Sequence, residues 1–140
     1  MRKALVDWLL GNLPPDLPRP EVRLVRRLHL DGQVLLGAYS RYIELAVGEI
    51  RDYALRSGVP PRDLLLQVFF HEYHHFLGHY VEQRTPRQAA LSTREREQYA
   101  ESYARLMMER VGKAGSFVRR PDLRYLRPGQ IRMRWRPTRL

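Results

Sequence analysis

The spacing of apolar residues changes several times along the chain, and each spacing predicts a different kind of element. Residues 2 to 11 carry Leu and Val at the spacing of one helix face, so we expect a short amphipathic helix there. A proline-rich linker follows this helix. The runs 21 to 30 and 33 to 39 are then rich in Val and Leu and meet at Asp31-Gly32, a dipeptide that is typical of a β-hairpin turn.

Two further elements are expected before the middle of the chain. In residues 41 to 47, the aliphatic residues Ile43, Leu45 and Val47 stand at every second position. This period of two is that of a strand, in which successive side chains point to opposite faces. If this strand lies at the edge of its sheet, an extended peptide substrate can pair with it. Residues 48 to 56 are expected to form a helix that ends at Ser57-Gly58.

The second half of the chain predicts two longer helices. The pair Pro60-Pro61 opens the first, because proline is tolerated in the first turn, and this helix extends from about residue 62 to the low eighties. Ser92 to Glu95 match the capping box S-x-x-E at the start of the second helix, which ends before Gly112. This order of elements predicts an α+β fold, in which a small antiparallel or mixed sheet packs on the two long helices.

Composition narrows the class of protein. A chain of 140 residues is long enough for one domain with its own core. Cysteine is absent, so any metal must be bound through nitrogen and oxygen atoms. No apolar run reaches the ~18 residues that a membrane span needs. The apolar stretch near the N-terminus is short and is interrupted by Asp7, which argues against a signal peptide. A cytoplasmic protein is therefore expected.

The formal net charge of +10 is concentrated near the C-terminus. Residues 1 to 112 are nearly balanced, whereas residues 113 to 140 hold nine basic residues against Asp122 alone. We therefore expect a domain over 1 to 112 and a basic hairpin or arm over 113 to 140, either in the same domain or as a tail. One interpretation is that the apolar side of this arm packs on the body and its arginines are solvated. The other is that it binds nucleic acid or an acidic protein.

The strongest chemical signal lies within the first long helix. His71-Glu72-Tyr73-His74-His75 fits the pattern H-E-x-x-H. Two histidines four residues apart on a helix lie about 40° apart around the axis and ~6 Å apart along it, so both imidazoles can bind one cation. Large apolar residues flank the motif, and buried His and Glu must be paired, hydrogen-bonded or metal-bound. Zinc held there would lower the pKa of a water molecule, whose proton Glu72 would accept.

A catalytic zinc usually has a third protein ligand. The metzincin pattern H-E-x-x-H-x-x-G-x-x-H fails, because Val81 stands at its last position. His79 would lie ~12 Å along the axis from the first histidine of the motif, which is too far to share one ion. The third ligand is then acidic, or it is His29. Glu97 and Glu101 share one face of the second long helix, and either one is a candidate.

The segment Glu97-Gln98-Tyr99-Ala100-Glu101 reads E-x-x-A-E. H-E-x-x-H followed on a second helix by E-x-x-A-(D/E) resembles the zincin metallopeptidases of the gluzincin group, especially the small single-domain minigluzincins, over about residues 62 to 108. The resemblance implies a zincin-like fold in which Glu97 is the third zinc ligand and Glu101 orients a zinc-bound histidine. The chain departs from the family pattern in having Glu101 where Asp is commoner.

These residues predict a zinc-dependent metallopeptidase that cleaves a peptide or protein substrate. His71, His75 and Glu97 would bind Zn²⁺, and Glu72 would be the catalytic base. The alternative is a non-catalytic zincin-like metal-binding protein whose Arg-rich tail binds nucleic acid or an acidic partner. Glu72 favours the enzyme, because a structural metal site needs no general base. Three further side chains are candidates for stabilising the oxyanion: His79, Tyr99 and Tyr103.

Overall fold

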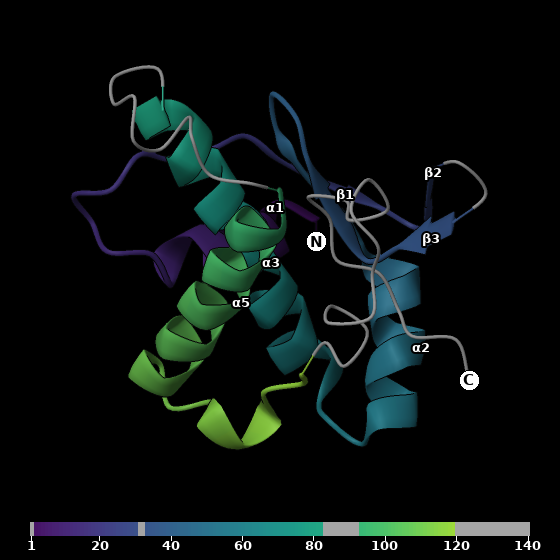
Figure 1. Ribbon diagram of the computed structural model, residues 1–140. Helices are drawn as coiled ribbons and strands as arrows, with labels where there is room; N and C mark the ends of the chain where they lie inside the picture. Colours follow the sequence, from purple (N-terminus) through teal and green to yellow (C-terminus); the bar gives the residue numbers. More distant parts are fainter. Residues whose placement is uncertain (1, 31–32, 83–92, 120–140) are drawn as a thin grey trace.

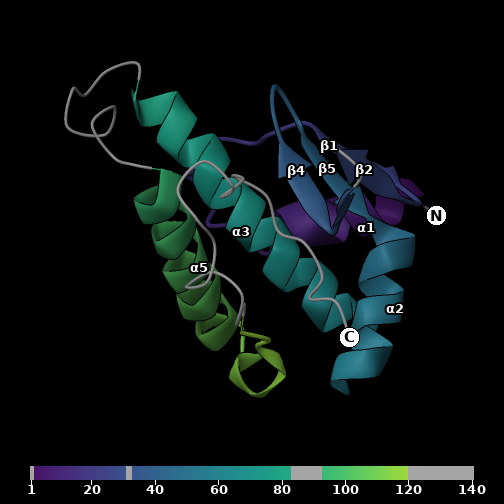
Figure 2. The same ribbon diagram turned by 45° about the vertical axis from the view of Figure 1, so that its right-hand side comes forward.

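The computed structural model describes residues 2–30, 33–82 and 93–119 and shows an α+β fold (Figure 1). In this part of the chain, a mixed three-stranded sheet and a two-stranded sheet pack against four α-helices. The long helix α3 (Pro61–Glu82) lies in the middle, with α5 (Thr93–Arg110) along one side and the larger sheet on the other (Figure 2). The fold class that was predicted from the order of elements is confirmed.

The three-stranded sheet has the order β1-β5-β4, so that β5 (Ile43–Ala46) is its central strand. β5 pairs in parallel with β1 (Val22–Val25) and in antiparallel fashion with β4 (Gly37–Tyr39). The strand expected over residues 41 to 47 is therefore present, but the idea that it forms the edge of the sheet is wrong. Both of its sides are already paired, so an extended peptide cannot add to it.

The second sheet consists of β2 (Leu28–Leu30) and β3 (Gln33–Leu35), which pair in antiparallel fashion. This pairing is the one expected for a hairpin, although its turn residues, Asp31 and Gly32, lie outside the described residues. Each apolar run that was predicted as one strand is divided into two short strands of different sheets. In the first run the division falls near Arg27, whose guanidinium pairs with the buried carboxylate of Glu49 on α2.

The remaining helices are α1 (Arg2–Gly11), α2 (Val47–Ser57) and the short 3₁₀ helix η1 (Ala114–Ser116). Gly58 follows α2 with a φ of +75°, and Gly112 lies beyond the end of α5 with a φ of +78°. Left-handed backbone of this kind favours glycine and ends a helix. Both predicted helix stops are therefore confirmed.

The core is built around α3, which is covered on every side. Residues 64 to 70 of this helix are buried throughout, and the buried Tyr73 donates a hydrogen bond of 2.7 Å to the carbonyl of Pro18. A helix with apolar residues around its whole circumference needs such cover. Several polar side chains on α3, among them Gln67, His71 and Glu72, are consequently held away from water. Although α3 is rich in apolar residues, no helix in the described ranges is long and apolar enough to cross a membrane.

The residues that follow Gly112 are attached to α3 by hydrogen bonds. Gln67 is fully buried; its Nε2 donates to the Val118 carbonyl at 2.6 Å, and its Oε1 accepts from the Val118 N–H at 2.8 Å. Asp63 accepts a hydrogen bond of 2.7 Å from Ser116 and lies 3.4 Å from the ammonium group of Lys113. The body of the fold thus includes contacts made by residues 113 to 119.

The expected division of the chain at residue 112 stays a prediction. Of the basic hairpin or arm expected over residues 113 to 140, the part from residue 120 onward, with both interpretations of its charge, lies outside the described residues.

We predict that Gln67→Met lowers the free energy of unfolding by about 1–3 kcal/mol. The methionine keeps the length of the side chain but leaves the N–H and C=O groups of Val118 without their partners. Urea unfolding followed by circular dichroism measures the effect, and Gln98→Met, at an exposed position of α5, is the matched control. Equal stability of the two variants would show that the contact with Val118 contributes nothing.

Candidate metal centre

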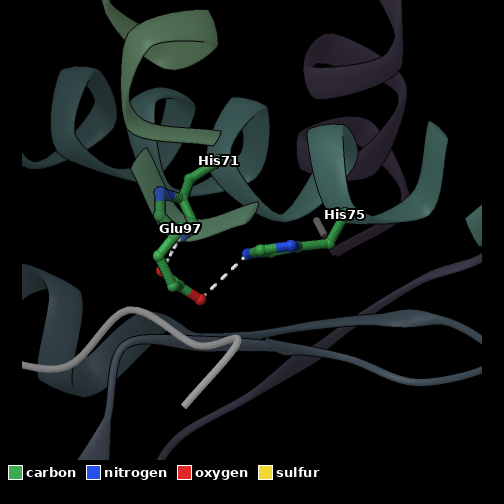
Figure 3. A group of neighbouring side chains, drawn as sticks. All are labelled: His71, His75 and Glu97. Atoms are coloured by element: carbon green, nitrogen blue, oxygen red, sulfur yellow. Dashed lines mark hydrogen bonds and ion pairs between the residues drawn. The ribbon is translucent and has the colours of Figure 1, made fainter. Parts of the chain in front are cut away.

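His71 and His75 lie one turn apart on α3, and their side chains project to the same side of the helix (Figure 3). The side chain of His71 is fully buried, and that of His75 is almost so. Their ring centroids are 5.1 Å apart, and the planes of the rings cross at 71°. The spacing of four residues on a helix accounts for this convergence, because such positions are neighbours on its surface.

Glu97 reaches the same point from α5 (Figure 3). Its fully buried carboxylate places one oxygen 3.0 Å from Nε2 of His71 and the other 3.1 Å from Nε2 of His75. Ala100 and Ala104, which are also fully buried, follow Glu97 at helical spacing. Such small residues let two helices approach closely, and Glu97 can then span the gap between them.

These three side chains fit a metal ion both in donor type and in spacing. Two imidazole nitrogens and one carboxylate oxygen are a donor set that zinc accepts. The three donor atoms lie within 4.8 Å of one another. Two donors bound ~2 Å from one tetrahedral zinc ion lie ~3.3 Å apart, which is close to the separations between Glu97 and the two histidines. His71, His75 and Glu97 therefore form a candidate metal site, and the donors alone do not select one metal.

Glu101 lies on the other side of His71. Its Oε2 is 3.6 Å from Nδ1 of His71, the ring nitrogen that does not face Glu97. A carboxylate beside this nitrogen orients the imidazole and leaves Nε2 to face the candidate site. The residue pattern left both glutamates open as the third ligand. In the structure, Glu97 lies beside Nε2 of both histidines, whereas Glu101 lies beside Nδ1 of one.

Glu72 is fully buried next to this group. Its Oε2 lies 4.0 Å from Nε2 of His71, so that a further carboxylate borders the three donors. Gly37 on β4 packs directly over it: a Cβ atom at residue 37 would come within 3.2 Å of Cγ of Glu72 and 2.8 Å of Cγ1 of Val68. A larger residue would therefore displace one of these side chains. Sequence reasoning missed Gly37, which belongs to no motif and is distant from α3 along the chain.

The carboxylates determine the protonation of His71 in the metal-free protein. Burial by itself lowers the pKa of this histidine, but the charge of Glu97 and hydrogen bonds with Glu101 and Glu97 outweigh it and raise the pKa to about 9. At neutral pH the metal-free site therefore holds an imidazolium beside a carboxylate. A divalent cation bound there would replace the positive charge of that proton, because a metal-binding histidine must be neutral.

His29 and His79 lie outside the candidate site. His29 is exposed on β2, and His79 is exposed near the end of α3, where its ring centroid lies 6.0 Å from that of Tyr39. Neither belongs to the group of three donors found among the described residues. The alternative that His29 is the third ligand therefore finds no support in the described geometry.

His74 points elsewhere and packs on an aromatic ring. Its centroid lies 5.2 Å from that of Tyr103, and both side chains are partly buried. Burial and the neighbouring His75 and His71 lower the pKa of His74 to about 4, so it is neutral at physiological pH. Packing thus accounts for His74. Tyr99, another candidate for stabilising an oxyanion, is half exposed on α5.

Comparison of the chain with protein-family models, with curated proteins and with solved structures found no match. Any assignment of function therefore depends on the residues of the candidate metal centre and on their geometry.

Zinc binding is expected to distinguish the two glutamates. Glu97→Ala removes a donor and should abolish stoichiometric zinc binding, whereas Glu101→Ala should weaken it about 10–100-fold by loosening the orientation of His71. Competition with a chromophoric chelator measures the affinity, and Glu109→Ala, at an exposed position of α5, is the control. If Glu101→Ala lost more zinc affinity than Glu97→Ala, Glu101 would be the ligand and Glu97 the residue that orients a histidine.

Proposed function

We propose that this protein is a zinc-dependent metallopeptidase of the gluzincin type. The observation that supports this most strongly is the position of Glu97, whose carboxylate lies within 3.1 Å of Nε2 of both His71 and His75. The H-E-x-x-H motif describes a single helix, whereas this contact joins that helix to a distant segment of the chain. His71, His75 and Glu97 would hold Zn²⁺.

When bound, zinc would supply Lewis acidity and bring the pKa of a water molecule close to neutral. All other steps depend on side chains of this chain.

In this proposal, Glu72 acts as the general base. Its carboxylate borders the three donors without belonging to them, with Oε2 4.0 Å from Nε2 of His71. Water attacks the peptide carbonyl carbon and gives a proton to an Oε atom of Glu72. The C–N bond then breaks, and the leaving amine takes this proton. Because Glu72 is fully buried, bulk water has little access to the proton while Glu72 holds it.

Glu101 acts through His71 rather than on the substrate. With its Oε2 3.6 Å from Nδ1 of His71, the charge of Glu101 favours a proton on that nitrogen and would keep Nε2 directed toward Glu97. Glu101 is therefore a positioning residue. The role proposed for Glu72 is separate, since a metal site that serves only structure has no use for a general base.

The test of the proposal is Glu72→Gln in the zinc-loaded protein. We expect this variant to retain zinc and to lose cleavage of unfolded protein substrates by about 10²–10⁴-fold, because glutamine cannot accept the proton. Cleavage is followed by mass spectrometry of the products from a denatured protein mixture, with Glu109→Gln as the control for loss of a surface charge. Undiminished cleavage by Glu72→Gln would exclude Glu72 as the base, and no cleavage by the zinc-loaded wild type would argue against a peptidase.

Gly37→Ala tests whether the position of Glu72 limits the rate. The added methyl group should displace Glu72 or Val68, and kcat should fall at least about tenfold while zinc content stays at the wild-type level. Gly11→Ala is the matched control, because a Cβ atom at Gly11 would meet nothing within 4 Å. Wild-type kcat in Gly37→Ala would mean that Glu72 tolerates the displacement.

A further inference from the structure

A cavity of about 560 Å³ lies between α1, β1, α2 and the first turns of α3. Leu65 of α3 lines this cavity, and His71 follows about 9 Å further along the helix axis. The cavity is therefore separate from the candidate metal centre. In Figure 2, α1, β1 and α2 all lie on the side of α3 that faces away from α5. The volume is within the range of about 300–1,000 Å³ that is typical of pockets for small organic ligands.

The floor and sides of this cavity are apolar. Leu24, Ile50 and Leu65 come from three different elements and are buried at its base, while Leu5 and Val47 are partly buried in its walls. None of these side chains offers a hydrogen bond. They would favour an apolar chain, because such a chain leaves water when it enters.

The rim of the cavity is positively charged. Arg2 of α1, Arg51 of α2 and Arg62 of α3 line it, and all three are exposed. The described residues that line the cavity include no Asp or Glu. A lining that combines apolar side chains with three exposed arginines is complementary to a molecule with an apolar chain and an anionic end.

Two of the arginines are held in place and keep further donors. Arg2 donates one hydrogen bond of 2.7 Å to the Leu24 carbonyl, and the guanidinium of Arg62 lies 4.5 Å from the ring centroid of Trp8. A guanidinium has five N–H donors, so these contacts leave donors for a ligand. Arg51 lies 3.7 Å from the carboxylate of its neighbour Asp52, but both side chains are exposed, and water weakens that attraction.

We propose that this cavity binds a carboxylate amphiphile of the fatty-acid class. The apolar chain would lie on the leucine and isoleucine side chains, and the carboxylate would pair with the arginines at the rim. The basic C-terminal residues of the same chain are a poorer occupant, because they carry the same sign of charge as the rim. This site is independent of the proposed peptidase activity.

Calorimetric titration of the full chain with dodecanoate, below its critical micelle concentration, tests the proposal. We expect saturable binding of one dodecanoate per chain. Dodecanol, which keeps the apolar chain but lacks the charge, should bind about tenfold more weakly. Dodecyltrimethylammonium, which carries the opposite charge, should not bind.

Variants distinguish the two parts of the cavity. The double variant Arg51→Gln and Arg62→Gln should weaken dodecanoate binding at least about tenfold, whereas Arg56→Gln, at an exposed position of α2 outside the cavity lining, should leave it unchanged. Ala4→Trp fills the cavity without altering its charge, so it should weaken the binding of both dodecanoate and dodecanol. Ala4 is exposed, and its replacement should leave the melting temperature close to that of the wild type.

Four results would overturn the proposal. The first is the absence of saturable dodecanoate binding, and the second is wild-type affinity in both the double arginine variant and Ala4→Trp. The third is loss of dodecanoate binding in His75→Ala. The fourth is dodecanoate binding that is seen only after removal of residues 120 to 140. The third result would place the carboxylate at the metal centre, and the fourth would show that the C-terminal residues fill the cavity.

Discussion

A buried carboxylate between two buried imidazoles is the interaction on which the arrangement of the two longest helices depends. Glu97 and His71 have no exposed surface, and a charge removed from water costs several kcal/mol unless a partner compensates it. The apolar contacts of α3 and α5 supply the general attraction between them. The contacts of Glu97 with His71 at 3.0 Å and with His75 at 3.1 Å add a specific polar pairing to this general attraction.

The side chains of the candidate site are held by different neighbours of α3. The helix itself sets the spacing of His71 and His75, and α5 brings Glu97 and Glu101 to their nitrogens. Glu72 instead faces β4, where the backbone of Gly37 packs over it. The proposed metal ligands and the proposed base are therefore positioned by separate contacts, and a change in the sheet can move the base without removing a ligand.

Local signals predicted the helices and part of the candidate site, because each signal involves only a few adjacent residues. Gly58 and Gly112 mark helix ends through backbone that glycine adopts readily, and the H-E-x-x-H pattern needs one helix only. The residue pattern is compatible with Glu97 or Glu101 as the third ligand, and only the resemblance to the gluzincins favours Glu97. The central place of β5 and the function of Gly37 were not predictable in this way. They depend on which distant segments pair and pack, and a strand's own period of two does not contain that information.

Gly37 matters for the candidate site because it has no side chain and so leaves room for Glu72 and Val68. A Cβ atom at position 37 would come within 2.8 Å of Val68, 3.2 Å of Glu72 and 3.3 Å of the backbone oxygen of Glu44, so the closest contact is with Val68. If Glu72 must stay in place, only Val68 can become smaller to admit a methyl group at position 37. In divergent copies of this chain, an alanine at position 37 should therefore occur together with a smaller residue at position 68, and the two positions should vary as a pair.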